Sequence, residues 1–233
     1  MENSNPSPKV SVSYAGERPA PLNADESKSN KDVQEVFNDP EVPETELAHR
    51  WTLWEQYDSK GKSYTETMSK VAWFGDLITF WQVWNQIAHA DPNNFFSSLE
   101  EGKQTANFYE VNGTLQRVSS LAFFKTGVIP AWEDARNRLG GDYFVKIDKD
   151  GALVKDIWNS VILELVSGSF DNVDRVCGLR VVDKLDFLKI ELWVDYVDVS
   201  GGEVGKTIET YFAQMLKKCG VEGCKLEFSQ HKY

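Results

Sequence analysis

The chain has 233 residues, of which 41% are hydrophobic and 12% are aromatic, and its formal net charge at pH 7 is −11. This length and apolar content suffice for one domain with a single core. The acidic balance excludes a protein that grips nucleic-acid backbones at large, because such binding requires a basic surface; any contact with RNA must occur at a small, locally basic site.

The cysteines indicate a reducing compartment. Cys177, Cys219 and Cys224 match no zinc or redox spacing, so we interpret them as reduced thiols. No apolar run reaches the length of a membrane span, and the N-terminus has no hydrophobic signal region. We therefore expect a soluble protein without a membrane partner, in the cytoplasm and with the nucleus as an alternative.

The first part of the chain predicts a tail followed by strands. Residues 1–46 are rich in Asn, Ser, Pro, Asp, Glu and Lys without a hydrophobic period, which predicts disorder. The folded domain is expected at 47–233. Residues 50–54, Arg-Trp-Thr-Leu-Trp, alternate as a strand does. A turn at 58–61 and a second strand through Tyr64 are predicted to follow.

Residues 76–90 have the pattern of an amphipathic helix, with Asp76 as its N-cap and Pro92 just past its end. Its predicted buried stripe consists of Phe80, Val83, Trp84 and Ile87. Trp81 lies on the shoulder of that stripe, level with Leu77. A tryptophan there is either the edge of the core or a docking point for a partner, and the helical pattern alone favours the core edge.

The rest of the chain alternates strands with single helices. Residues 91–120 are polar and predict a surface insertion with a hairpin at Asn112-Gly113. Further strands are predicted at 121–125, 143–148, 177–183, 188–197 and 225–229, and further helices at 152–166 and 202–219. This order predicts an α+β fold with a largely antiparallel sheet.

An aromatic residue and a carboxylate are adjacent in the segment 129–134, Ile-Pro-Ala-Trp-Glu-Asp. In an exposed loop, Glu133 could accept two hydrogen bonds from the N1–H and N2 amine of guanine, beside the face of Trp132. From these residues alone, a core position for Trp132 with a solvated Glu133 is an equal alternative.

Basic residues mark the two late strands. Arg180 and Lys184 share one strand face, and Lys189, Glu191 and Trp193 share one face of the next strand. A hairpin with Lys184 and Lys189 near its turn would form a basic spot suited to a di- or triphosphate. Lysines that only keep the turn soluble are the alternative, which this pattern alone favours.

Enzymatic motifs are weak. Residues 201–207 resemble a phosphate-binding loop only vaguely and have the wrong spacing. The three histidines, His49, His89 and His231, are far apart in sequence and belong to no metal or nucleophile motif. We therefore predict a protein that is not an enzyme and has no catalytic residue, metal ion or cofactor.

Four stretches together resemble the eukaryotic translation initiation factor 4E family, whose members bind the 5′ cap of messenger RNA. They are residues 50–54; Phe80-Trp81 with Trp84-Asn85; residues 129–134 with Gly140-Gly141; and Ser169-Phe170-Asp171 through Val176-Cys177-Gly178 to Trp193. The resemblance covers about residues 47–231. It implies a strongly curved, largely antiparallel sheet with three helices packed on its convex face.

The resemblance implies that the 7-methylguanosine cap binds on the concave face, between the rings of Tyr64 and Trp132. Methylation at N7 makes the base cationic, so an aromatic sandwich gains cation–π energy. Glu133 is implied to bind the guanine edge. The other implied contacts are Trp193 at the methyl group and Lys184, Lys189 and the weaker candidate Arg180 at the phosphates. Tyr64 departs from the family, where tryptophan is usual.

The resemblance also implies a protein partner, an initiation scaffold or a repressor that docks a helical peptide on the convex face. Trp81 matches the central docking residue, with Leu77 beside it, which reverses the preference given above. Thr45-Glu46-Leu47 and Asn159-Ser160 differ from the usual residues, so we expect a non-standard peptide. The chain is expected to be monomeric outside its complex. An adaptor or repressor that acts mainly through this helical face is the alternative function.

Overall fold

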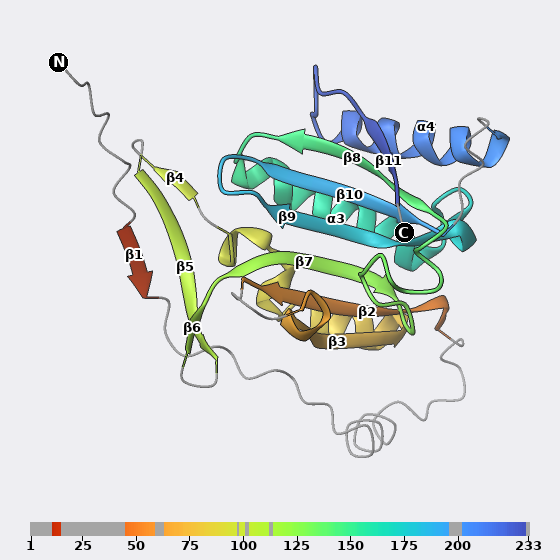
Figure 1. The fold of residues 1–233 in the computed structure, drawn as a ribbon. Helices are drawn as coiled ribbons and strands as arrows, with labels where there is room; N and C mark the ends of the chain where they lie inside the picture. Colours follow the sequence, from red (N-terminus) through yellow and green to blue (C-terminus); the bar gives the residue numbers. More distant parts are fainter. Residues whose placement is uncertain are drawn as a thin grey trace, which may run out of the picture.

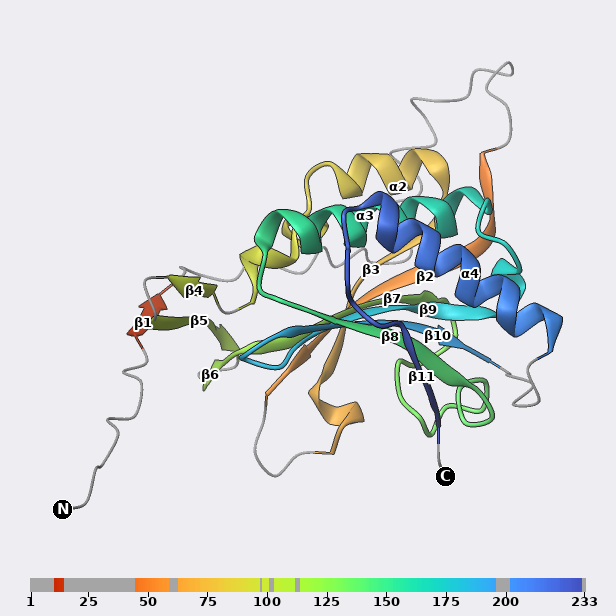
Figure 2. The same ribbon diagram turned by 90° about the horizontal axis from the view of Figure 1, so that it is seen from above.

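The computed structural model describes residues 11–14, 45–58, 63–96, 98–100, 103–111, 114–195 and 202–231. Most of the predicted tail and of the predicted turn at 58–61 lies outside these residues. The main body is one sheet whose helices all cover the same face, as Figures 1 and 2 show.

The main sheet has seven strands in the order β11-β8-β10-β9-β7-β2-β3. The strands are β2 (Glu46–Tyr57), β3 (Met68–Asp76), β7 (Val118–Lys125), β8 (Gly141–Ile147), β9 (Val176–Asp183), β10 (Leu188–Val194) and β11 (Glu227–Gln230). Every neighbouring pair is antiparallel. The predicted fold class, with a largely antiparallel sheet, is thus confirmed.

One predicted strand was wrong. Tyr64 does not lie in a strand but precedes a 3-10 turn, η1 (Thr65–Thr67), and β3 begins only at Met68. The turn forms because Thr67 donates through Oγ1 to the carbonyl of Tyr64 at 2.7 Å, a local side-chain bond that competes with strand pairing. Tyr64 is therefore carried by the connection between β2 and β3.

Three helices, α2 (Leu77–Trp84), α3 (Gly151–Ser167) and α4 (Glu203–Lys218), cover one face of the sheet (Figure 2). Asp76 caps α2 as predicted, accepting from Thr79 N at 2.7 Å. The helix predicted over 76–90 ends early, at Trp84, and residues 88–90 form the 3-10 turn η2 (Ala88–Ala90). The chain leaves the helix because His89 turns into the core, where its Nε2 lies 3.1 Å from the Glu55 carboxylate.

Strand alternation separates two clusters of apolar side chains. The helix-covered face carries the main core, which includes Leu53, Leu121, Phe123, Leu179, Val181, Ile190 and Leu192. The helices contribute fully buried residues such as Ile157, Val161 and Phe212. The smaller cluster, which includes Trp54, Ala122, Phe124 and Trp193 from the opposite face of the sheet, also contains Val128 and Cys177.

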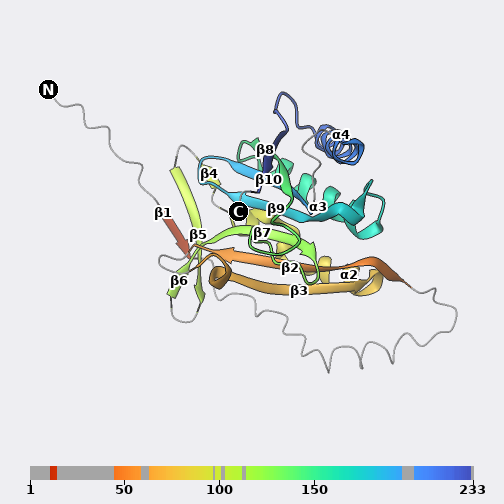
Figure 3. The ribbon, with the colours of Figure 1, turned by 45° about the vertical axis from the view of Figure 1, so that its right-hand side comes forward.

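The predicted insertion forms a small second sheet. It contains β4 (Ser98–Glu100), β5 (Lys103–Val111) and β6 (Thr114–Gln116), together with β1 (Ser11–Tyr14) from the N-terminal segment. Strands β5 and β6 are antiparallel, with Val111 paired to Thr114. The turn predicted at Asn112-Gly113 lies outside the described residues. Figure 3 shows this sheet beside one end of the main sheet.

Two further findings concern membrane-spanning helices and metal sites. Among the described residues, no helix has both the length and the apolar character needed to cross a membrane. In the same part of the chain, no three His, Cys, Asp or Glu side chains gather into a group that could hold a metal ion.

Candidate functional site

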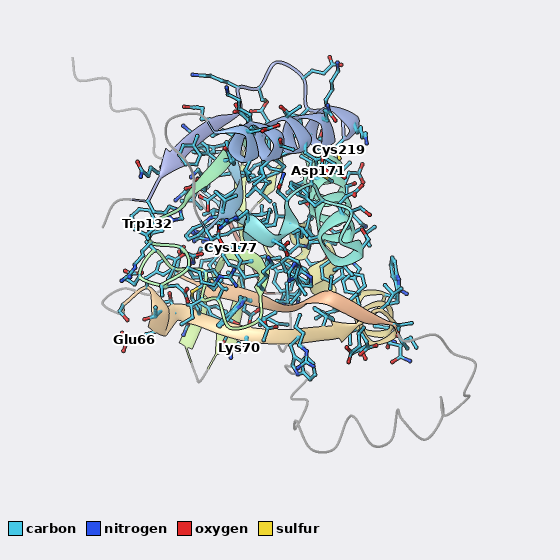
Figure 4. The ribbon with its side chains drawn as sticks, turned by 90° about the vertical axis from the view of Figure 1, so that its right-hand side faces the viewer. Glu66, Lys70, Trp132, Asp171, Cys177 and Cys219 are labelled. Atoms are coloured by element: carbon cyan, nitrogen blue, oxygen red, sulfur yellow. The ribbon has the colours of Figure 1, made fainter. Side chains whose placement is uncertain are left out.

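Two loops project from the face of the sheet that the helices leave uncovered (Figure 2). One joins β2 to β3 and carries Tyr64, and the other joins β7 to β8 and carries Trp132 and Glu133. In Figure 4, Trp132 lies on the same side of the molecule as Glu66, which belongs to the Tyr64 loop. The two loops that carry these aromatic residues therefore project from one face of the sheet and not from opposite faces.

The Trp132 loop is held by side-chain hydrogen bonds within itself. The Asp134 carboxylate accepts from the backbone N–H groups of Ile129 and Arg136, each at 2.9 Å. The fully buried Asn137 amide donates to the carbonyls of Ile129 at 2.7 Å and Ala131 at 2.9 Å. These bonds fix the loop while Trp132 stays 55% exposed, so the alternative of a core position for Trp132 was wrong.

The ring of Tyr64 is half-buried against a cation. The Arg180 guanidinium lies over the ring, with Cζ 5.3 Å from its centroid. Burial raises the pKa of Tyr64 to about 12, an effect that Arg180 opposes and that Glu191 and Glu133 strengthen. The phenol is therefore neutral at ordinary pH, and Glu133 lies within electrostatic reach of Tyr64.

Arg180 is anchored by three strands of the sheet. It lies directly opposite Glu191 in the β9–β10 register, and its Nη1 is 3.5 Å from that carboxylate. The guanidinium also donates to Gln56 Oε1 at 2.7 Å and to Ser120 Oγ at 3.3 Å. Glu191 in turn accepts from the indole N–H of Trp193 at 3.0 Å. Arg180 is thus held in a fixed position against the ring of Tyr64.

Lys189 is already paired with carboxylates. Its Nζ lies 2.7 Å from Glu191 Oε1 and 3.1 Å from Asp142 Oδ2, and 4.0 Å from the centroid of the Phe144 ring. Burial acts to lower the pKa of Lys189, but the two carboxylates outweigh it and hold the pKa above its usual value. The predicted basic spot of Lys184 and Lys189 is therefore corrected, because the charge of Lys189 is neutralised by carboxylates. Of these two lysines, Lys184, at the β9–β10 turn, is the exposed cation.

His231 is a residue of this face that the sequence analysis missed. The pairing of β11 with β8 brings it to the end of the sheet, where its ring lies 4.4 Å from Trp193 and stacks on Trp132 at 6.0 Å and 26°. Its Nδ1 donates to the carbonyl of Asn137 at 2.7 Å, and its Nε2 is 3.4 Å from Asp142. Packed against His231, Trp193 is only 1% exposed. No local sequence signal marks His231, because its contacts come from distant segments.

The convex face carries the other predicted site. Trp81 is 40% exposed and Leu77 39% exposed, although the ring of Trp81 also packs against Phe80 at 5.3 Å. A groove beside α2 is lined by Trp81, Asn159 of α3 and Leu163, among others. Trp81 therefore lies at the edge of the core and is also accessible, so the two interpretations of its position are compatible.

Comparison with known proteins identifies the family. The family model described as eukaryotic initiation factor 4E matches residues 46–233. Initiation factor 4E of Bos taurus is 26% identical over 178 residues, which are 75% of this chain and 70% of that protein. Initiation factor 4E1 of Drosophila melanogaster is 27% identical over 148 residues, or 63% of this chain. The chain spans 49% of the Drosophila protein and 51% of its Dictyostelium discoideum relative.

Solved structures share the fold. The complex of C. elegans eIF4E-3 with the 4E-binding protein Mextli has a TM-score of 0.61 and 23% identity, covering 81% of this chain and 94% of that chain. Ascaris suum eIF4E-3 with m7G cap has a TM-score of 0.61 and 22% identity, covering 81% and 92%. The matched family consists of initiation factors and not of enzymes, as the sequence analysis expected. The curved antiparallel sheet, its three helices and the match over residues 46–233 place the chain in the eukaryotic initiation factor 4E family.

Proposed function

We propose that the protein binds the 7-methylguanosine 5′ cap of messenger RNA on its helix-free face and acts in translation initiation or its regulation. Membership of the initiation factor 4E family supports this proposal, as do solved structures of relatives in complex with m7G cap or a cap analogue. The observation that carries it is the exposed pair Trp132 and Glu133, held on a fixed loop on the same face as Tyr64.

In the proposed mode, the methylated base lies between Tyr64 and Trp132. The base carries a positive charge, and each ring offers a negative face to it, so stacking favours the methylated over the unmethylated form. Glu133 accepts hydrogen bonds from the guanine edge and complements the charge. The electrostatic influence of Glu133 on Tyr64 supports this arrangement.

The proposed contact between Trp193 and the methyl group requires a local rearrangement of the protein. Trp193 is 1% exposed, and the ring of His231 packs against it at 4.4 Å. Contact with the ligand therefore requires His231 to move aside together with the end of β11. The side chains of β11 are exposed, but His231, which follows the strand, is 6% exposed, so its displacement breaks its packing on Trp193 and its bond to the Asn137 carbonyl.

We also propose a protein partner on the convex face, docked on Trp81 and Leu77. Solved relatives in complex with Mextli and with 4E-BP support a partner of this kind. Trp84 donates its indole N–H to the Asn159 side chain at 2.8 Å, so the polar group at Asn159 is already satisfied. A partner peptide at this groove is then held mainly by apolar contact with Trp81, Leu77 and Leu163.

The test of cap binding uses tryptophan fluorescence and retention on immobilised 7-methyl-GTP. We expect m7GTP to bind about tenfold or more tightly than GTP, because only the methylated base gains the cation–π term. Trp132→Ala is expected to abolish binding to the immobilised 7-methyl-GTP. Trp81→Ala also removes an exposed indole, but from the other face, and this variant should still bind. Equal elution by m7GTP and GTP would show that the aromatic sandwich is wrong.

A further inference from the structure

The phosphate side of the proposed site contains a buried cluster of four charges, which we call the neutral cluster. Its cations are Arg180 and Lys189, and its anions are Glu191 and Asp142. Their side chains are 11%, 19%, 7% and 4% exposed, respectively. Two positive and two negative charges cancel, so this cluster offers no net attraction to a phosphate.

The four charged groups of the neutral cluster pair with one another. Lys189 lies within 3.1 Å of both carboxylates, and Glu191 links it to Arg180 and to the Trp193 indole. Drawing the ammonium toward a phosphate would take one close cationic partner away from each of the buried carboxylates Asp142 and Glu191, which costs more than an exposed contact returns. A phosphate brought to Lys189 would also meet two carboxylates at close range, and like charges repel.

Two further lysines on these strands and their turn, Lys184 and Lys146, are solvent-exposed. Lys184 lies at the β9–β10 turn, and Lys146 lies over the rings of Phe144 and Phe187, with Nζ 5.9 Å and 5.7 Å from their centroids. Exposed ion pairs change affinity by about fivefold or less. The overall charge of −11 further opposes the approach of a polyphosphate.

From this neutral cluster, we propose that the site selects the methylated base and is nearly indifferent to the length of the phosphate chain. Its ligand class then extends from the capped triphosphate to 7-methylguanosine monophosphate. The inference rests on the proposed cap site and specifies which part of the cap supplies the affinity.

The first experiment compares m7GMP, m7GDP and m7GTP by fluorescence titration with the whole chain. We expect the three dissociation constants to agree within about tenfold, and added salt to weaken m7GTP little more than m7GMP, because few counterions are released. An advantage of m7GTP over m7GMP beyond about tenfold would overturn the inference. Absence of binding by all three would instead overturn the proposed cap function.

The second experiment opens the cluster. Asp142→Asn and Glu191→Gln each remove one of the two anions that pair with Lys189 and give the cluster a net positive charge, so the preference for m7GTP over m7GMP should rise about fivefold or more. The control is Asp156→Asn on α3, an exposed residue whose loss changes the net charge equally on the opposite side of the sheet. A ratio measured within each variant is independent of the fraction that folds. Ratios unchanged in both variants, or raised equally by Asp156→Asn, would contradict the role of the cluster.

Discussion

The guanidinium of Arg180 lies over the ring of Tyr64, with 5.3 Å between Cζ and the ring centroid. One face of this ring thus lies against a cation of the protein itself, so in the proposed cap site the base stacks on the opposite face. Arg180 is held in turn by Gln56, Ser120 and Glu191. Tyr64 therefore rests on a fixed platform although its backbone belongs to a loop.

The first prediction concerns this platform. Arg180→Lys keeps the charge but loses the planar group that lies over the ring and bonds several partners. We expect m7GTP affinity to fall about three- to tenfold, with a modest loss of stability. Fluorescence titration measures the effect, and Arg175→Lys, at an exposed arginine, is the control. Binding by Arg180→Lys equal to that of the wild type would mean that Tyr64 needs no such support.

The second prediction ranks the polar contacts of the ligand. Glu133→Ala should cost more affinity than Lys184→Ala, since a charge-assisted bidentate pair is worth about 1.5–3 kcal/mol and an exposed ion pair about 0–1 kcal/mol. Both side chains are exposed, so neither change should alter the fold. Calorimetric titration of m7GTP into each variant gives the ranking. The reverse order would argue against Glu133 as the group that binds the guanine edge.

The third prediction separates the two faces. Trp81→Ala removes an indole that is 40% exposed, so unfolding free energy should fall by only about 1–2 kcal/mol and cap affinity should stay within about twofold. Capture of a helical 4E-binding peptide should be lost, as expected for a central aromatic contact. The peptide is titrated into the wild type and the variant, with Trp132→Ala as the reciprocal control. Undiminished peptide binding by Trp81→Ala would place the partner elsewhere.

The fourth prediction concerns pH and the buried Lys125. Lys125 is 5% exposed, and its amine donates to the carbonyls of Val173 and Asp174. Burial, with nearby Arg136, lowers its pKa to about 8. Between pH 8 and the unfolded-state pKa near 10.5, the unfolded chain binds more protons, so this group makes stability rise with pH.

The measurement is urea unfolding of the wild type and of Lys125→Met between pH 7 and pH 10. The wild type should gain roughly 2 kcal/mol relative to the variant over this range. Burial raises the pKa of Cys177 to about 12, which acts in the opposite direction above pH 9, and this burial, the largest cause of the shift, is present in both proteins. Parallel stability curves would show that Lys125 titrates normally in the fold.

The elements of the fold were largely predictable because their signals are local. The helix at 151–167 has a strong apolar period, and the Asp150 side chain caps it by accepting from Ala152 N and Leu153 N. The predicted helix over 76–90 failed in its second half because a tertiary contact of His89 with Glu55 outweighed helical propensity. The strand predicted through Tyr64 failed because the Thr67 hydroxyl favours a turn there.

The sequence by itself determined the fold class and the position of Trp81 on the edge of its helix, because each depends on neighbours close along the chain. The sequence left Trp132 with a core position and an exposed position as equal alternatives, and the structure decided for the exposed one. Only the tertiary structure decided that Lys189 is neutralised and that His231 lies against Trp132 and Trp193. Asp142 reaches Lys189 across 47 positions of sequence, through the register of β8 with β10. Electrostatic pairing depends on distances in space, and those exist only once the strands have aligned.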